Sequence, residues 1–412
     1  MELTKKQEQI ISVLIKLIIV TAIFFPIRDQ YAKRSMYYTT FALPTFLSLC
    51  LVVYLGTVNT VRREKSRFMS VFIVFLLLYI GADLAINFLY HHYYWELFHK
   101  ATAFMLLPFL WYKLPEDFFE RKKIISFLLT VIVISCILSI VAYYMGIDQI
   151  KFVKGELVPK IVRHGESTYL DKRLTFTYPH KSEYGVFLVL FTGLCLKFKK
   201  FFSKQILFYG ALGVLLYTTY LTNSVAALGC VGVVVVGYVL SRLPWKKIVE
   251  KYKIAIGGIG IVLCGIGVFG YQYIATKRDL TSMGARFPIW KASIEVIKQN
   301  PEGIGMEFEK LYLWNMANNC HNVFLVELLR YSIPVGILFL VLFLLIFGKT
   351  FWKYKTFSSA VWIGLFGILC IDYSLKDFNM PMLILCLFFL FFATEKRMGI
   401  EFKERKKNAE NS

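Results

Sequence analysis

The sequence predicts an all-α integral membrane protein with about 12 transmembrane helices and two long extracytoplasmic loops. Three observations support this prediction. Of the 412 residues, 57% are hydrophobic and only 18% are charged, whereas a soluble domain carries about 25% charged residues. Apolar runs long enough to cross a bilayer, about 20 residues each, recur along the chain. Lysine and arginine collect in alternate short loops, as they do on the cytoplasmic side of membrane proteins.

The apolar runs give the expected membrane spans. The first run begins at Ile10 and has no small-residue cleavage site behind it, so we expect a retained span rather than a signal peptide. The expected spans lie at residues 10–27, 39–60, 68–90, 101–114, 124–146, 184–198, 205–221, 225–241, 254–274, 323–347, 358–375 and 380–394.

Basic residues set the predicted orientation of these spans. Five basic short loops lie at residues 61–67, 115–123, 197–204, 241–247 and 349–355, and the C-terminal tail is basic as well. The short loops between them are poorer in cations, with residues 28–35 as the exception. The positive-inside rule therefore predicts a multi-pass protein with both termini in the cytoplasm.

Two segments between spans are much longer than the others, and both fall on the predicted outer side. Long loops in compact proteins are usually functional or disordered. The predicted organisation is N-terminal transmembrane helices at 1–146, a first long outer loop at 147–183, central transmembrane helices at 184–274, a second long outer loop at 275–322, C-terminal transmembrane helices at 323–394 and a basic cytoplasmic tail at 395–412.

The second long loop contains an expected amphipathic surface helix. In RFPIWKASIEVIKQNP, the apolar side chains of Ile289, Trp290, Ile294 and Ile297 share one face at helical spacing. The Asn-Pro pair at 300–301 ends the helix. We expect this helix to lie along the membrane surface, with Trp290 at the level of the lipid headgroups.

Both long loops are rich in lysine and arginine, on the side where topology disfavours them. One explanation is attraction to anionic lipid headgroups. The other is an anionic substrate at the outer membrane surface. Guanidinium groups bind phosphate in bidentate fashion, so the arginines are stronger candidates than the lysines.

Other classes of site and partner have little support in the sequence. Seven of the eight cysteines lie inside apolar runs and the eighth, Cys320, has no obvious partner, so we expect no disulfide framework. No Cys/His cluster has the spacing of metal ligands, and we expect neither a metal nor a cofactor. Loops on the outer face of a membrane do not meet nucleic acid.

Four local patterns occur in a fixed order. DKRLTFTYPHKSEYG at 171–185 ends the first long loop, and TNS at 222–224 forms a tight polar turn. ARFPIWKASIEVIKQNPEGIG at 285–305 contains the amphipathic helix and a Gly-x-Gly turn. His321 and Asn322 then open a strongly apolar run.

Together these patterns resemble the superfamily of O-antigen ligases and Wzy-type polysaccharide polymerases. In that superfamily an outer-loop Arg precedes an aromatic-Pro-polar-Gly stretch, which matches Arg173 and YPHKSEYG. A later Arg stands four residues before a Trp, followed by an amphipathic helix and an Asn-Pro-x-Gly-x-Gly turn, which matches Arg286, Trp290 and NPEGIG. A His-Asn pair then opens a long apolar helix, which matches His321 and Asn322. The resemblance covers roughly residues 170 to 345.

The chain also departs from the superfamily's pattern. Ser332 replaces the usual Gly in the turn after Asn322, and Gly336 stands one place late, because Val335 occupies the expected position. TNS stands where many relatives have Ser-Arg, so no arginine is present there. These departures bear on the subfamily more than on the superfamily.

The resemblance implies glycosyl transfer outside the cytoplasm, at the bacterial cytoplasmic membrane. The donor it implies is a glycan joined through pyrophosphate to a polyprenyl lipid, and the acceptor is a sugar hydroxyl. Such a reaction needs the charge of the leaving pyrophosphate stabilised, which preorganised arginines at a partly dry interface do well. Arg173 and Arg286 are the candidates for this catalytic role.

The acceptor hydroxyl needs a base, and a histidine titrates near neutral pH. His321 is the candidate base, with Asn322 positioning it or the acceptor sugar. The alternative is that His321 only caps the helix that follows it. The remaining candidate substrate-binding residues are Trp290, Tyr178, His180 and Arg278.

The leading hypothesis is therefore a polymerase that joins lipid-linked repeats into a capsular or surface polysaccharide. Its partners would be membrane lipids and the flippase and chain-length regulator of the same pathway. A ligase that moves a finished glycan to another acceptor uses the same donor chemistry and stays open. A transporter of the lipid-linked unit is a further alternative. It is supported by Asp83, Asp372 and Lys16, charged residues that lie in or beside apolar runs.

We expect Glu327 and Arg330, three residues apart on one helix, to pair with each other.

Overall fold

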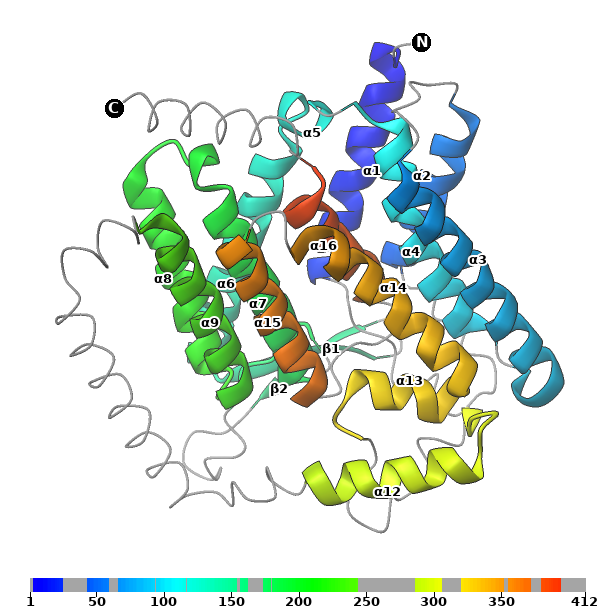
Figure 1. The fold of residues 1–412 in the computed structure, drawn as a ribbon. Helices are drawn as coiled ribbons and strands as arrows, with labels where there is room; N and C mark the ends of the chain where they lie inside the picture. Colours follow the sequence, from blue (N-terminus) through cyan, green and yellow to red (C-terminus); the bar gives the residue numbers. More distant parts are fainter. Residues whose placement is uncertain are drawn as a thin grey trace, which may run out of the picture.

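The computed structural model describes residues 3–24, 43–58, 66–92, 94–115, 117–153, 156–161, 173–178, 180–243, 286–305, 320–351, 355–371 and 379–393. Most of these residues are helical (Figure 1). In this part of the chain, five helices are long and apolar enough to cross a membrane, namely Lys5–Phe24, Arg67–His91, Ile124–Tyr144, Val225–Arg242 and Ile333–Phe351. The expectation of a mainly helical membrane protein is thus confirmed, while the number of about 12 spans stays a prediction.

The N-terminal apolar runs fold as helices close to where the sequence predicts them. They are α1 (Lys5–Phe24), α2 (Leu43–Thr57), α3 (Arg67–Ile86), α4 (Trp95–Lys113), the short α5 (Phe118–Arg121) and α6 (Ile124–Tyr144), and a π-helix, η2 (Asn87–His91), continues α3. Glu8 at the start of α1 forms ion pairs with Arg121 (2.6 Å) and Lys122 (2.7 Å). The basic loop predicted at 115–123 therefore lies at the end of the molecule where α1 begins (Figure 1).

The first long loop contains a small two-stranded sheet, which the sequence analysis did not predict. Strands β1 (Ile147–Val153) and β2 (Glu156–Ile161) pair antiparallel, from Ile147 opposite Ile161 to Val153 opposite Glu156, with an irregularity between Ile147 and Gln149. The sequence signal is the run of β-branched and aromatic residues around a glycine in IKFVKGELV, which is typical of a hairpin. A search for helical spacing misses such a run.

The rest of the described chain is helical. Its elements are α7 (Lys181–Lys197), the 3-10 helix η3 (Lys199–Phe201), α8 (Gln205–Leu221), α9 (Val225–Arg242), α12 (Arg286–Gln299), α13 (Val323–Tyr331), α14 (Ile333–Phe351), α15 (Lys355–Ile371) and α16 (Met380–Phe391). The span predicted at 254–274 lies outside the described residues.

The span predicted at 323–347 is in fact two helices, α13 and α14, with Ser332 between them. Ser332 has a φ of 129°, a backbone conformation that ends a helix and that L side chains rarely adopt. Pro334 follows in the first turn of α14, where its missing N–H costs nothing. A Cβ at Gly336 would lie 2.7 Å from the backbone nitrogen of Leu328, so glycine allows α14 to approach α13 closely.

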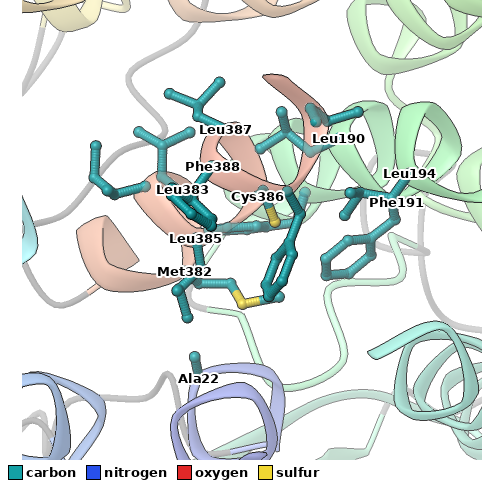
Figure 2. Close-up of a cluster of buried hydrophobic side chains, with 14 of the residues drawn as sticks. Ala22, Leu190, Phe191, Leu194, Met382, Leu383, Leu385, Cys386, Leu387 and Phe388 are labelled. Atoms are coloured by element: carbon teal, nitrogen blue, oxygen red, sulfur yellow. The ribbon is translucent and has the colours of Figure 1, made fainter. Parts of the chain in front are cut away.

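Helix α16 forms the centre of the main apolar core. All of its residues are buried, as expected for a helix that is apolar on every side. Figure 2 shows Met382 and Cys386 of α16 beside Phe191 of α7, with Ala22 of α1 nearby. The core is thus built from helices far apart in the sequence.

The described parts of both long loops lie at the same end of the molecule. Strands β1 and β2 and helices α12 and α13 occupy the lower half of Figure 1, whereas α5 and the beginning of α1 lie at its top. This arrangement brings the sequence patterns of both loops to one end of the helix bundle.

Candidate functional site

Asn322 is the N-cap of α13. Its side-chain Oδ1 accepts hydrogen bonds from the backbone N–H groups of Phe324 (3.0 Å) and Leu325 (3.1 Å), which satisfies two donors that a helix start leaves open. The capping role that the sequence allowed for His321 therefore belongs to its neighbour.

His321 stands just outside the helix, partly buried, in the left-handed backbone region with a φ of 47°. A residue other than glycine held there costs about 1–3 kcal/mol, and such strain often occurs at functional sites. The imidazole is thus placed by the loop before α13 rather than by the helix itself.

Helix α12 is tied directly to the residue before His321. The indole N–H of Trp290 donates to the carbonyl oxygen of Cys320 at 2.9 Å. Cys320 is buried, and burial raises the pKa of its thiol to about 11, so the thiol stays neutral. We expected Trp290 at the headgroup level; the structure uses its polar edge to hold the loop that carries His321.

The apolar face of α12 packs on α13. Ile289 and Ile297 of α12 form a second apolar cluster with Cys320, Val326 and Leu329. Ile294, which the spacing placed on the same face, is instead 43% exposed. The predicted helix is present, and its buried face packs on α13.

Arg286 is the first residue of α12, and it connects this helix to α15. Its Nε donates to the carbonyl oxygen of Ile371, the last residue of α15, at 2.6 Å. A guanidinium group has five N–H donors, and this bond uses one of them. The orientation of Arg286 is therefore set by two helices.

The NPEGIG turn after α12 fits against the end of α13. Gly303 has a φ of 83°, and a Cβ there would lie 2.7 Å from the carbonyl oxygen of Arg330. Gly305 has a φ of 54°, and its Cβ would lie 2.6 Å from the ring of His91. Both glycines are required by conformation and by space.

Hydrogen bonds hold the same turn in place. The N–H of Ile304 donates to Leu329 (2.9 Å), and the N–H of Ile333 donates to Pro301 (3.0 Å). His91 Nε2 lies 2.8 Å from the carbonyl oxygen of Glu302, and its ring must donate there, because a carbonyl only accepts. The turn thus fixes the junction between α13 and α14.

Arg173 belongs to a second group of residues. The next residue, Leu174, donates its N–H to the carbonyl of Leu221 at the end of α8 (3.1 Å), and Phe176 bridges to Gln149 of β1. Within the described part of the chain, Arg173 Nε is buried and has no hydrogen-bond partner. A buried donor without an acceptor is costly, so this atom fits a site for an anion.

Tyr178 and His180 lie in the same segment but in different surroundings. The ring of Tyr178 is buried and stacks on Tyr184 (4.9 Å between centroids), and burial raises the pKa of its hydroxyl well above the usual value. The expected contact of Tyr178 with a sugar therefore has no support from the structure. His180 is exposed, and its Nδ1 accepts from the N–H of Ser182 at the start of α7 (3.3 Å).

The candidate residues thus form two groups at one end of the molecule. Arg286, Trp290, His321 and Asn322 are connected through α12 and α13, whereas Arg173, Tyr178 and His180 lie around β1, α7 and α8. Arg278 lies outside the described residues. Among the described residues, no group of three or more His, Cys, Asp and Glu side chains could hold a metal ion.

The sequence reasoning missed two buried ion pairs. It expected Glu327 and Arg330 to pair with each other, but the structure gives each a partner on α4: Glu327 pairs with Lys100 and Arg330 with Glu96. The only signal in the sequence was the spacing of Glu96 and Lys100, four residues apart and so on one face of a helix.

Comparison with known proteins supports the resemblance drawn from the motifs. No curated protein matches the chain. Residues 210–340 match the family model of the O-antigen ligase. This stretch runs from α8 into α14 and includes Arg286, Trp290, His321 and Asn322, whereas Arg173 precedes it. Residues 210–340 of this membrane protein are therefore similar to the O-antigen ligase family.

Proposed function

We propose that the protein is a polymerase of a capsular or surface polysaccharide. It transfers glycan from a polyprenyl-pyrophosphate donor to a hydroxyl group of a lipid-linked repeat unit, at the outer face of the bacterial cytoplasmic membrane. The family match supports a glycan-transferring membrane enzyme. The choice of donor, acceptor and membrane face is part of the proposal.

One observation supports this function best: the hydrogen bond from Trp290 to Cys320. It joins the helix that begins with Arg286 to the loop that carries His321. An enzyme of this kind needs a cation for the leaving phosphate and a base for the incoming hydroxyl. The bond fixes the helix that carries the arginine relative to the loop that carries the histidine.

In the proposed reaction, Arg286 and Arg173 bind the pyrophosphate of the donor. As the bond between the anomeric carbon and the phosphate oxygen breaks, its electron pair moves to the pyrophosphate, and the guanidinium groups stabilise the growing negative charge. The buried Nε of Arg173, with no partner among the described residues, suits this role.

His321 removes the proton from the acceptor hydroxyl while that oxygen forms the new bond to the anomeric carbon. Asn322 holds the start of α13 and thereby the backbone next to His321. The residues that contact the sugars would include Trp290, His180 and Arg278. No metal takes part in this proposal, since two arginines supply the positive charge.

The decisive experiment uses the purified full-length protein and a synthetic polyprenyl-pyrophosphate-linked repeat unit. We expect longer lipid-linked chains to form by mass spectrometry, together with free polyprenyl pyrophosphate. A wild-type protein that leaves the donor intact would overturn the proposal. In cells, a null strain should accumulate lipid-linked single repeats, with the flippase and the chain-length regulator of the pathway still present.

A ligase is the second candidate, because the matching family model is described as O-antigen ligase. The same purified assay separates the two. A polymerase extends its own lipid-linked substrate, whereas a ligase needs a different acceptor and releases a glycan of unchanged length onto it.

Transport of the lipid-linked unit has less support from the described residues. Asp83 of α3 accepts a hydrogen bond at Oδ1 from Asn87 Nδ2 (2.7 Å), one turn further along. The buried carboxylate of Asp83 therefore has a polar partner on its own helix. Asp372 lies outside the described residues.

A further inference from the structure

Four charged side chains are buried between α4 and α13. Lys100 Nζ lies 2.6 Å from Glu327 Oε2, and the two side chains are only 3% and 5% exposed. About one turn away on both helices, Arg330 donates to Glu96 Oε1, with both side chains also buried. We call Glu96, Lys100, Glu327 and Arg330 the charge quartet.

Tyr331 completes the surroundings of the charge quartet. Its hydroxyl donates to the second carboxylate oxygen of Glu96, and the ammonium group of Lys100 lies 3.8 Å from the centroid of its ring. The two cations and two anions balance, so the contact between α4 and α13 carries no net charge. Each carboxylate accepts a charge-assisted hydrogen bond, which is stronger than a neutral one.

Stability alone does not explain why these charges are buried. Removing two ions from water costs free energy that their attraction repays only in good geometry, and apolar side chains of similar volume often stabilise a contact as well. The two ion pairs also make one register of α13 against α4 more favourable than its neighbours. A shift of α13 along α4 by one turn would bring Glu327 beside Glu96, or Arg330 beside Lys100, and like charges repel.

The position of α13 matters because the helix begins directly after His321. Glu327 lies four residues after Val323, the first residue of α13, about 6 Å along a helix at 1.5 Å per residue. By fixing the position of α13, the charge quartet acts through this helix on the backbone next to His321. Other contacts also hold α13, among them the Trp290 bond before its start, the NPEGIG turn at its end, and the packing of α12 and α14 against it.

We propose that the charge quartet is a positioning device that fixes α13 in one register against α4 and so sets the place of His321. This inference rests on the proposed function, in which His321 is the base. Glu96, Lys100, Glu327 and Arg330 are positioning residues and touch no reacting atom. The first half of the chain, which the family match does not cover, thereby controls the geometry of the second.

The test measures kcat and the donor KM of the purified full-length protein in lipid nanodiscs. Glu327→Gln should lower kcat by about tenfold or more, since a misplacement of about 1 Å can cost about a hundredfold in rate. The donor KM should change by less than about threefold, because the arginines that hold the pyrophosphate are unaltered. A donor-binding defect would instead raise KM.

Charge reversal gives a second, independent measurement. Lys100→Glu and Glu327→Lys each place two like charges together, and each should lose most of kcat. The double variant Lys100→Glu/Glu327→Lys restores one pair of opposite charges, although each new charge then faces a like charge of the quartet. It should recover at least about tenfold over the worse single variant, as expected for residues coupled in one pair.

The ion pair at the other end of the molecule provides a matched control. Glu8→Gln removes a carboxylate that pairs with Arg121 and Lys122, far from α13, and should leave kcat unchanged. A wild-type kcat in Glu327→Gln would overturn the proposal, and so would a folded double variant no better than the single ones. If every quartet variant fails to fold, the quartet is a folding element, and the positioning role is wrong.

Failure of the proposed function has a different signature. A wild-type protein without glycan transfer in the same nanodiscs would refute the function before any variant is made. Wild-type kcat in His321→Asn would refute the role of the base, whatever the quartet variants do.

Discussion

The indole N–H of Trp290 donates to the carbonyl oxygen of Cys320, the residue before His321. One hydrogen bond thus joins the amphipathic helix to the histidine loop. Trp290→Phe keeps an aromatic ring but removes the donor, leaving a partly buried carbonyl unsatisfied at a cost of about 1–3 kcal/mol. We expect reduced glycan transfer at a nearly normal protein level, measured as polymer yield per unit of membrane-inserted protein. Ile294→Leu, at an exposed position on the same helix, should have little effect. Equal losses in both variants would contradict a specific role for the bond.

His321→Asn should abolish polymer and cause lipid-linked single repeats to accumulate. Asparagine tolerates the left-handed backbone of this position, so the loop can keep its conformation, but asparagine cannot act as a base. Asn322→Ala is the companion variant: it removes the cap and costs about 1 kcal/mol of stability, yet leaves the imidazole. Mass spectrometry of the lipid-linked intermediates distinguishes loss of the base from loss of the cap. Normal polymer from His321→Asn would return this residue to a structural role.

Arg286→Lys should be nearly as damaging as Arg286→Ala, because lysine cannot bind phosphate in bidentate fashion or reproduce the Nε bond to Ile371. The same is expected at Arg173. Lys291→Ala, an exposed cation on α12, serves as the control and should leave polymer yield close to normal. Substantial polymer from either lysine variant would mean that the arginine supplies only diffuse positive charge.

Gly303→Ala should destabilise the protein, because φ is 83° and the new Cβ would meet the carbonyl of Arg330. Strain of this kind costs about 1–3 kcal/mol, and thermal unfolding in detergent will show it as a lower midpoint. Gly210→Ala is the matched control: it lies in α8 with nothing within 4 Å of the added Cβ, where alanine favours the helix by about 1 kcal/mol. If the two variants unfold at the same temperature, the turn is not under the constraint described.

The predicted orientation can be checked by cysteine labelling of intact cells in a background without other cysteines. A membrane-impermeant reagent should label Lys310→Cys, in the second long loop, and should not reach Lys204→Cys, in a basic loop. Protection at position 310 would reverse the assignment of the outer face.

Local spacing was enough to predict the amphipathic helix, because apolar residues at helical intervals report on one element alone. It was not enough to predict that this face packs on α13 or that Ile294 is exposed, since both depend on contacts between elements. The span at 323–347 was predicted as continuous, although the resemblance places a turn at Ser332, because the apolar run continues on both sides of it and only the backbone of one residue divides the two helices. The partners of Glu327 and Arg330 lie more than 220 residues earlier, and one sequence carries no record of such long-range contacts.

Helix α16 has consequences for how the protein responds to its lipid. With 12 residues, it is about 18 Å long at 1.5 Å per residue, whereas the hydrocarbon core of a bilayer is about 30 Å thick. An exposed helix this short would force the surrounding acyl chains to compress. Because α16 is enclosed by other helices, its length imposes no such hydrophobic mismatch. Changes in acyl-chain length should therefore tilt the peripheral helices while the central one keeps its packing.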